Sequence, residues 1–298
     1  MKIYITGIAG LLGYSIYHCL KDKEKVDGFD IVETEDRGMS YHHISLFDTE
    51  AVEQELIRGK ADVLIHTAAL VNVDECEDHP EDAEKLNVWV TAQLAQICQR
   101  HHIKMVYIST DAVFDGEEER LYTEEDPTNP VNVYGRTKLE GEDFVLRYPD
   151  NLVFRTNLYG INIQKKQSFG EWIYQSLKED QVLHMFTDID FSPILAEELA
   201  ELIYKACQNN LCGLYHACGT GCMTKYAFAV RLKEIFGLKT GRIETSISGK
   251  AVLKARRSKH MGMSNEKLRR ELQVEISTPE EGIKRFYQQI KEGESSGN

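Results

Sequence analysis

Short apolar runs alternate with segments of helical periodicity through the first half of the chain. The runs that predict buried strands occupy residues 2–6, 26–32, 61–67, 105–109 and 152–155. The segments with apolar residues at helical spacing occupy residues 11–21, 49–58, 80–100 and 134–147. Strands that alternate with helices at this spacing predict a parallel sheet with helices on both faces. Because short crossovers between parallel strands are right-handed, the expected fold class is a doubly wound α/β sheet.

The second half of the chain is less regular. Helical patterns occupy residues 169–177, 196–208, 225–236 and 279–291, and strand patterns occupy residues 182–185 and 213–217. Thr278 and Pro279 suit the N-cap and first position of the last helix, and the tail 293–298 is expected to fray. We expect residues 1–157, rejoined by 192–230, to form the sheet domain. Residues 158–191 and 231–298 would form a smaller C-terminal part.

Composition narrows the classes of function. The 298 residues are 42% hydrophobic and carry a net charge of -13. An acidic surface repels phosphate backbones, which argues against nucleic acid as a partner, although local basic groups can still bind a small anion. No apolar stretch is long enough to span a membrane, and glycine interrupts the short apolar run at the start, so no signal peptide is expected. An odd number of cysteines, seven, suits the reducing cytoplasm.

Four of the cysteines lie within 16 residues of each other, at positions 207, 212, 218 and 222. A zinc site usually shows paired C-x2-C spacings, and none occurs here. The pairs His42-His43 and His101-His102 fit surface loops and helix ends. We therefore expect no metal site.

A glycine-rich turn follows the first strand and opens the first helix. Gly7, Gly10 and Gly13 have the spacing G-x-x-G-x-x-G. Glycine lets the backbone turn tightly and approach a pyrophosphate, and the free N–H groups of the helix, including those of Leu11 and Leu12, attract that anion. At the start of a strand–helix–strand unit this pattern predicts a dinucleotide site, and the spacing is typical of short-chain dehydrogenases.

An acidic residue at the end of the second strand is expected to accept hydrogen bonds from the adenosine ribose. Asp30 stands there, 17 residues after Gly13. Its carboxylate would repel the 2′-phosphate of NADPH, so the sequence predicts NAD(P)H with NADH slightly favoured. Arg37, in the following loop, offers a charge that offsets this repulsion.

A tyrosine and a lysine stand four residues apart in the segment Tyr134-Gly-Arg-Thr-Lys138. On a helix this spacing places both on one face. Hydride transfer to a carbonyl carbon leaves an alkoxide that a phenol can protonate, and a nearby ammonium lowers the phenol pKa toward working pH. The Thr110 hydroxyl would hold the carbonyl oxygen. Thr110, Tyr134 and Lys138 are therefore the predicted catalytic residues, and Lys138 also suits the nicotinamide ribose.

Together these segments resemble the extended short-chain dehydrogenase/reductases, and more narrowly the dTDP-4-dehydrorhamnose reductase family, over nearly the whole chain. The segments that carry the resemblance are His66-Thr-Ala-Ala69 with Val73-Asp74, Ser109-Thr-Asp-Ala-Val-Phe-Asp-Gly116, Asn132-Val-Tyr-Gly-Arg-Thr-Lys-Leu-Glu-Gly141, Phe154-Arg-Thr-Asn157, Asp190-Phe-Ser-Pro193, Gly213-Leu-Tyr-His216 and Arg257 leading to Met263-Ser-Asn-Glu-Lys-Leu268. The resemblance implies a Rossmann sheet with a smaller C-terminal substrate-binding domain. It also implies reduction of the 4-keto group of a dTDP-linked deoxysugar, giving dTDP-L-rhamnose.

The resemblance assigns further residues. Ala68 and Ala69 would bind the cofactor, and Asn87 would be a structural asparagine of the superfamily. The substrate-side positions would be Thr110, Asp111, Leu158 and Arg257.

The sequence departs from the family pattern at three positions. Ala112 stands where the family usually has a tyrosine, Leu158 where a sugar-packing tryptophan is expected, and Ser258 where a proline follows the late arginine. These changes affect positions expected to contact the sugar and leave the predicted residues for hydride transfer unchanged. Two alternatives therefore stay open: another nucleotide-sugar reductase or epimerase of the superfamily, and a non-catalytic subunit that resembles the methionine adenosyltransferase β subunit. A homodimer is compatible with either.

Overall fold

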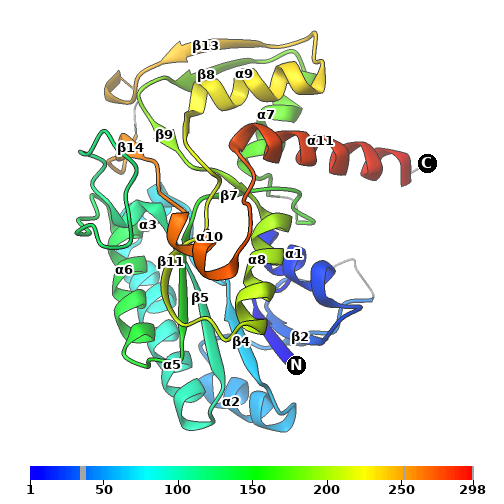
Figure 1. The fold of residues 1–298 in the computed structure, drawn as a ribbon, viewed down its shortest axis with the longest axis vertical. Coiled ribbons are helices and arrows are strands. Elements are labelled where there is room, and N and C mark those ends of the chain that lie inside the picture. Colours follow the sequence, from blue (N-terminus) through cyan, green and yellow to red (C-terminus); the bar gives the residue numbers. More distant parts are fainter. Residues whose placement is uncertain (34–37, 165, 251–252, 297–298) are drawn as a thin grey trace.

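A seven-stranded parallel sheet forms the centre of the molecule (Figure 1). The structure is a computed structural model that describes residues 1–33, 38–164, 166–250 and 253–296. Across the sheet the strands are β11 (Gly213–His216), β6 (Leu152–Thr156), β5 (Lys104–Thr110), β4 (Val63–His66), β1 (Lys2–Thr6), β2 (Lys25–Asp30) and β3 (His42–His43). The order reverses between β1 and β4, which is where doubly wound sheets bind dinucleotides.

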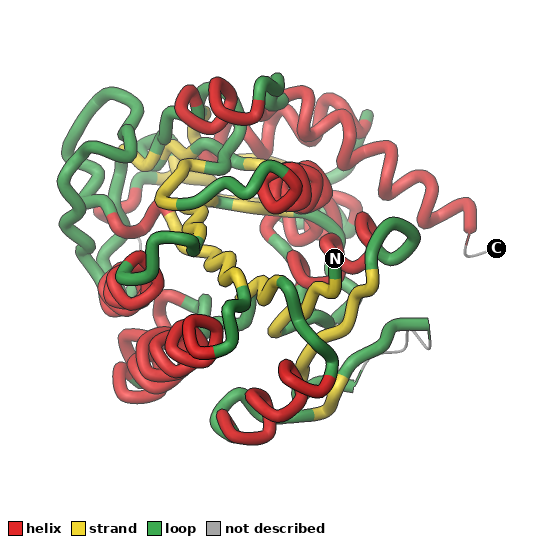
Figure 2. The backbone as a smooth tube through the Cα atoms, turned by 60° about the horizontal axis from the view of Figure 1, so that its bottom comes forward, coloured by secondary structure: helices red, strands yellow, loops and turns green. Residues whose placement is uncertain are grey.

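Alternating side chains of the strands pack against helices on the two faces. Ile3 and Ile5 of β1 join one apolar cluster, whereas Tyr4 between them joins another. The first cluster includes residues of α1 (Leu11–Leu20), α8 (Ala196–Gln208) and α10 (Glu266–Leu272). The second includes residues of α2 (Thr49–Arg58), α5 (Thr91–Arg100) and α6 (Val133–Leu146). In Figure 2 the strands run between two groups of helices, which confirms the predicted doubly wound α/β class.

The segment predicted as one helix over residues 80–100 is divided in the structure. It consists of α4 (Pro80–Ala83), a π-helical section (Glu84–Val90) and α5. A short helix that the pattern did not predict, α3 (Val73–Asp78), precedes it, and the Asn72 side chain caps that helix by accepting hydrogen bonds from two backbone N–H groups. π-Helical insertions often occur at functional sites, and this one carries Asn87.

A second lobe packs around its own apolar cluster, at the top of Figure 1. Its elements are β7 (Leu158–Tyr159), α7 (Phe169–Lys178), β8 (Val182–Phe186), β9 (Asp190–Phe191), β10 (Ile194–Leu195), β12 (Met223–Thr224), α9 (Lys225–Phe236), β13 (Arg242–Ser246), β14 (His260–Met261) and α11 (Pro279–Ser296). Strand β11 and helix α8 return to the central sheet. The division into domains stays a prediction, and α9 packs into the cluster of the second lobe from Phe228 to Phe236, on both sides of the predicted boundary at residue 230.

The last helix begins where the sequence predicts and ends later. The Thr278 hydroxyl accepts from the Glu281 N–H, and the Glu281 carboxylate accepts from the Thr278 N–H, so the two residues form a capping box. The prediction of a frayed tail was wrong as far as Ser296, because α11 continues to that residue and extends away from the body of the molecule (Figure 1).

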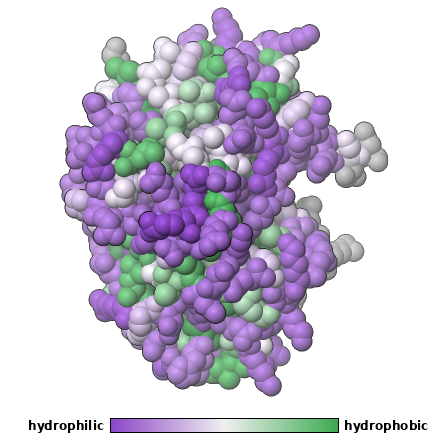
Figure 3. Space-filling view, in the orientation of Figure 1, coloured by the Kyte–Doolittle hydropathy of each residue, from purple (hydrophilic) through white to green (hydrophobic). Residues whose placement is uncertain are grey.

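Polar residues cover most of the face shown in Figure 3, and apolar residues are scattered among them. No helix of the described segments has the length and apolarity needed to cross a membrane. All seven cysteines are free thiols. Within the described ranges no group of three or more His, Cys, Asp or Glu side chains is arranged so that it could hold a metal ion. The prediction for His42 was wrong, because this residue forms edge strand β3 and its ring nitrogen lies 3.1 Å from the Glu55 carboxylate.

Candidate functional site

The glycine turn lies between β1 and α1 and leaves no room for side chains. Gly7 has a φ of +66°, and a Cβ atom there would lie 3.1 Å from the Ala68 backbone. A Cβ atom at Gly13 would lie 2.2 Å from the Gly7 carbonyl oxygen, which excludes any other residue. The first turn of α1 has no side-chain cap and no acidic residue. Its free N–H groups and positive helix end therefore suit a phosphate.

The predicted cofactor residues of this turn do not all offer side chains. Leu12 is buried in the core and Leu11 is half-buried, so Leu12 would contribute through its backbone N–H. Asp30 ends β2 beside the turn, where its carboxylate accepts hydrogen bonds from the Ala9 N–H at 2.9 Å and the Val32 N–H at 3.0 Å. These bonds fix the carboxylate beside the glycine turn. Arg37 lies outside the described residues.

The loop after β4 brings Ala68 and Ala69 next to the glycine turn. The Ala68 N–H donates to the Thr6 hydroxyl at 3.3 Å. Asn87, which is buried, accepts from the Leu70 N–H and donates to the Leu70 carbonyl and to the Thr137 hydroxyl. Asn87 therefore ties this loop to α6, which agrees with the structural role that the resemblance implies.

Two of the three predicted catalytic residues, Thr110 and Tyr134, are in contact at the carboxyl end of β5. Thr110 is the last residue of β5, and its hydroxyl is hydrogen-bonded to the Tyr134 phenol. Lys138 lies one turn further along α6, is 3% exposed, and places its ammonium 4.1 Å from the centre of the Tyr107 ring. Thr110 and Tyr134 therefore lie at the edge where open α/β sheets bind ligands, and the catalytic roles of these residues and of Lys138 stay a prediction.

The electrostatics of Tyr134 and Lys138 differ from the expectation. Burial raises the pKa of Tyr134 above its ordinary value, and the hydrogen bond with Thr110, rather than Lys138, opposes that rise. Burial lowers the pKa of Lys138 to about 7, while the Glu142 carboxylate one turn further on opposes this effect. The physical reason is that both groups are removed from water, which disfavours phenolate and ammonium alike.

A buried network that the sequence did not predict supports these residues from behind. Glu142 accepts hydrogen bonds from Ser109, the residue before Thr110, and from Arg155 of β6, whose Nη2 atom lies 2.7 Å away. Both charged side chains are nearly inaccessible to solvent. This network joins α6, β5 and β6. Ser109 and Arg155 stand in segments that carry the resemblance, and Glu142 lies four residues after Lys138.

The predicted substrate residues fall into two groups. Asp111 is buried beside Thr110 and accepts a hydrogen bond from Asn157 at 2.6 Å. Arg257 instead forms an ion pair with Asp74 at 3.1 Å, which joins two of the segments that carry the resemblance. Leu158 is half-buried in β7 and packs against the core of the sheet domain.

Two neighbours of the site were missed by the sequence analysis. Asn157 holds Asp111, and Lys225 at the start of α9 acts on the charge of Asp111 from the second lobe. Asn157 ends the segment Phe154-Arg-Thr-Asn157 that carries the resemblance, which could have marked it, whereas Lys225 stands in no motif.

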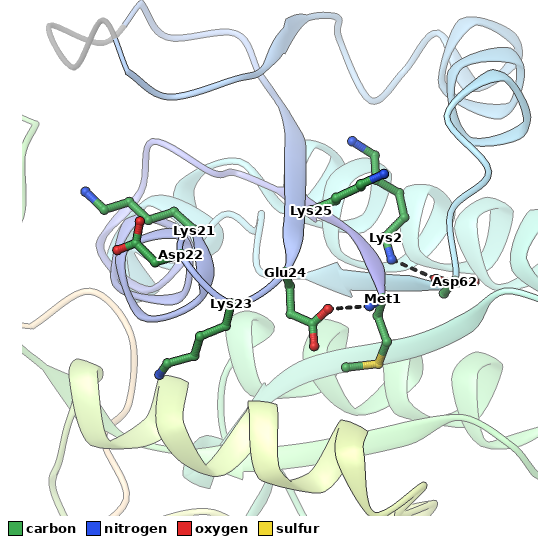
Figure 4. A pocket seen from close by; sticks show the side chains of 8 residues that line it. All are labelled: Met1, Lys2, Lys21, Asp22, Lys23, Glu24, Lys25 and Asp62. Atoms are coloured by element: carbon green, nitrogen blue, oxygen red, sulfur yellow. Dashed lines mark hydrogen bonds and ion pairs between the residues drawn. The ribbon is translucent and has the colours of Figure 1, made fainter.

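A hollow on the surface lies elsewhere, at the amino ends of β1 and β2 (Figure 4). It is lined by residues 1–2, 21–25 and 62. Figure 4 shows the Met1 amino group paired with Glu24 and the Lys2 N–H paired with Asp62. Since open α/β sheets bind ligands at the opposite edge, this hollow is not the candidate site.

Comparison with known proteins agrees with this geometry. A sequence model of the family described as "RmlD substrate binding domain" matches residues 1–292. The chain belongs to this family. An RmlD relative from Haloferax volcanii, named "Probable low-salt glycan biosynthesis reductase", is 31% identical over 83% of this chain and 84% of its own length.

Two further proteins that are similar to this chain carry names of different functions. The dTDP-4-dehydrorhamnose reductase of Bacillus anthracis, solved in complex with NADP, is 26% identical, has a TM-score of 0.87, and covers 97% of this chain and 99% of its own. The methionine adenosyltransferase 2 subunit beta of Mus musculus is 29% identical over 90% of this chain and 81% of its own length.

Proposed function

We propose that this chain reduces the 4-keto group of a nucleotide-linked deoxysugar with NAD(P)H, as a dTDP-4-dehydrorhamnose reductase does. The observation that carries the proposal is the contact of Thr110 with Tyr134 at the same sheet edge as the glycine turn, with Lys138 one turn further along α6. Membership of the RmlD family and the names of the relatives support it.

The residues present fit a dinucleotide. The uncapped first turn of α1 offers N–H groups to a pyrophosphate, and Asp30 offers a fixed carboxylate to a ribose. Bound NAD(P)H supplies a hydride to the carbonyl carbon. The Asp30 charge supports a slight preference for NADH, whereas the Bacillus anthracis relative was solved with NADP, so we propose NAD(P)H as the cofactor class.

Tyr134 would deliver the proton. Its raised pKa keeps the phenol protonated at neutral pH, which is the state that a proton donor needs. The Thr110 hydroxyl donates to Asp111 at 3.1 Å in this structure, and it would turn from that carboxylate to hold the carbonyl oxygen beside the phenol. Lys138, on the same helix face, would donate hydrogen bonds to the nicotinamide ribose.

The substrate side is proposed from fewer contacts. Asp111 and Leu158 would contact the sugar, and Arg257 would bind the substrate while it stays paired with Asp74. We further propose the cytoplasm as the location, because all seven cysteines are free thiols, as is usual for proteins in a reducing compartment. A homodimer stays a prediction.

A second candidate is a non-catalytic, dinucleotide-binding regulatory subunit. The similarity to the mouse methionine adenosyltransferase subunit favours it. Another reductase or epimerase of nucleotide sugars is the alternative within enzymes. Turnover of a keto sugar separates the enzymes from the regulatory subunit.

The test is oxidation of NADH and NADPH with a panel of nucleotide-linked 4-keto sugars, dTDP-4-dehydrorhamnose included. We expect turnover by the wild-type chain and a loss of kcat of about 10²–10⁴-fold in Tyr134→Phe, because general acid catalysis contributes that much. The affinity for the cofactor should change little, since only a hydroxyl is removed.

Tyr148→Phe, just after the end of the same helix, is the matched control and should keep full turnover. Full turnover in Tyr134→Phe would show that the proton comes from another group. Tight dinucleotide binding by a wild-type chain that reduces no sugar in the panel would favour the regulatory subunit.

A further inference from the structure

Tyr107 is a buried tyrosine that the proposed chemistry does not use. It lies in the middle of β5, and its ring belongs to the apolar cluster between the sheet and α6. Its hydroxyl donates to the Lys138 carbonyl oxygen at 3.4 Å. A Cβ atom at Gly141 would lie 2.4 Å from that hydroxyl oxygen, so the glycine leaves the space that the hydroxyl occupies. Tyr107 is therefore fitted against the helix that carries Lys138.

The His66 ring supports Tyr107 from the neighbouring strand β4. The two ring centres lie 5.7 Å apart, with an angle of 25° between the ring planes. His66 is itself fixed, because its ring nitrogens lie 2.6 Å from the Thr6 hydroxyl and 3.1 Å from the Thr91 hydroxyl. Burial lowers the pKa of His66 to about 3, so this ring is neutral and adds no positive charge near Lys138. Hydrogen bonds and stacking together fix the position of the Tyr107 ring.

The ammonium of Lys138 lies over this fixed ring, with its Nζ atom 4.1 Å from the ring centre. Among the residues that the structure describes, this ammonium has no hydrogen bond and no direct ion pair. Removing an ammonium from water without a partner costs stability. A cation–π contact offsets part of that cost and leaves all three N–H donors available for a ligand.

The acid that follows on the same helix is committed elsewhere. Glu142 accepts hydrogen bonds from Ser109 and from Arg155, whose Nη2 atom lies 2.7 Å away. A carboxylate paired directly with Lys138 would occupy the donors of the lysine, whereas an aromatic face does not. The Tyr107 ring is thus the group that contacts the ammonium, and the donors of Lys138 stay unused.

We propose that Tyr107 is a positioning residue, whose ring holds the charged Lys138 in place for the nicotinamide ribose. The proposal rests on the proposed function, in which Lys138 donates hydrogen bonds to that ribose, and it adds the group that fixes the lysine. Tyr107 acts through Lys138 and contacts neither the cofactor nor the sugar.

The test compares Tyr107→Phe with proteins that carry fluorinated phenylalanines at the same position. Fluorine withdraws electron density from the ring face and weakens cation–π contacts, while the shape of the ring changes little. Affinity for NADH and for NADPH is measured by fluorescence titration. Tyr107→Phe should keep the wild-type affinity, because the ring face remains. Successive fluorination up to 3,4,5-trifluorophenylalanine should weaken binding stepwise, by about 5- to 30-fold in all.

Tyr107→Leu removes the ring and should weaken dinucleotide binding by a similar factor. Tyr4→Leu is the matched control, because Tyr4 is buried in the same cluster and has the Lys2 ammonium 4.9 Å from its ring centre. The Tyr4 hydroxyl donates to Glu55 of α2, not to α6. Tyr4→Leu should lose a comparable amount of thermal stability and keep the dinucleotide affinity. Thermal unfolding of every variant checks that the fold is intact.

Lys138→Met separates the two proposals, and we expect it to weaken dinucleotide binding. If it does, and the affinity stays constant along the fluorinated series, the role of Tyr107 is overturned and the proposed function stands. If a folded Lys138→Met binds both dinucleotides as tightly as the wild-type chain, Lys138 does not hold the ribose. That result would overturn the role given to Lys138 in the proposed function, and the role of Tyr107 with it.

Discussion

Substitution of Glu142 by glutamine should destabilise the fold strongly, because it leaves a buried guanidinium without its counter-charge. The Arg155 side chain is 5% exposed, and its Nη1 atom already has no partner. Removing one partner of a buried ion pair costs about 3–5 kcal/mol. Glutamine keeps the volume and one acceptor oxygen, so we expect the lower limit, about 3 kcal/mol. For a chain of this size that corresponds to a fall in Tm of roughly 5 °C.

Calorimetry and urea unfolding measure this loss, and the same helix supplies the control. Glu140 pairs with Arg136 on the surface, where such pairs contribute about 0–1 kcal/mol. Glu140→Gln should therefore leave Tm nearly unchanged. The double variant Glu142→Leu/Arg155→Met removes both charges and should recover much of the stability. A Glu142→Gln variant as stable as Glu140→Gln would refute the reasoning, as would additive losses in the double variant.

The same substitution tests the electrostatics of Lys138. The Glu142 carboxylate raises the pKa of Lys138, which burial lowers to about 7. Without that carboxylate the pKa falls further, so the ammonium is lost at a lower pH as pH rises. If the charged lysine holds the ribose, the alkaline limb of the pH profile of kcat/KM for the cofactor should move to lower pH in Glu142→Gln. An unmoved limb would show that Glu142 has only a structural role.

Two further substitutions test the cofactor site. Gly10→Glu places a negative charge at the uncapped end of α1 and should weaken dinucleotide binding on the order of tenfold or more. The Cβ atom of the new side chain would lie 3.1 Å from the Gly7 carbonyl oxygen, so the fold should survive. Unchanged dinucleotide affinity in the folded variant would contradict the assignment of the cofactor site. Asp30→Ala should narrow or reverse the preference for NADH over NADPH in titrations followed by fluorescence. If the wild-type chain instead prefers NADPH tenfold, about 1.4 kcal/mol, Asp30 does not determine the cofactor preference.

The sequence predicted the elements whose pattern is local. Helices Thr49–Arg58, Ala196–Gln208 and Lys225–Phe236 have the predicted bounds, because the apolar spacing lies within each segment. Asp48 and Thr224 also cap the first and the third of them. The two-residue strands of the second lobe were missed. Strand β9 (Asp190–Phe191) exists only because β12 and β14 pair with it from more than 30 residues away, and no local pattern encodes that pairing.

The same difference between local patterns and long-range contacts determines which parts of the site could be predicted. Thr110, Tyr134 and Lys138 stand in motifs with fixed spacing, so the sequence alone brought them together. The ion pair of Arg257 with Asp74 and the facing charges of Lys225 and Asp111 join positions more than 100 residues apart. Such contacts depend on how the second lobe packs on the sheet, and a single sequence contains no periodicity that reports it.

Two of the positions that depart from the family pattern are buried and closely packed. Ser258 is buried and donates a hydrogen bond to the Phe114 carbonyl at 2.9 Å, which a proline could not do. Ala112 is buried where α6 packs closely, since a Cβ atom at Gly135 would lie 2.1 Å from the Ala112 carbonyl oxygen. These residues therefore support a packed site rather than a degraded one.

A packed site with an altered sugar side favours an enzyme of changed substrate over a subunit that has lost catalysis. A chain that only binds a dinucleotide needs the glycine turn and Asp30. It has no use for a phenol kept protonated by burial beside the Thr110 hydroxyl. Tyr134 is explained by a ligand that carries a carbonyl group, which is what a keto sugar provides.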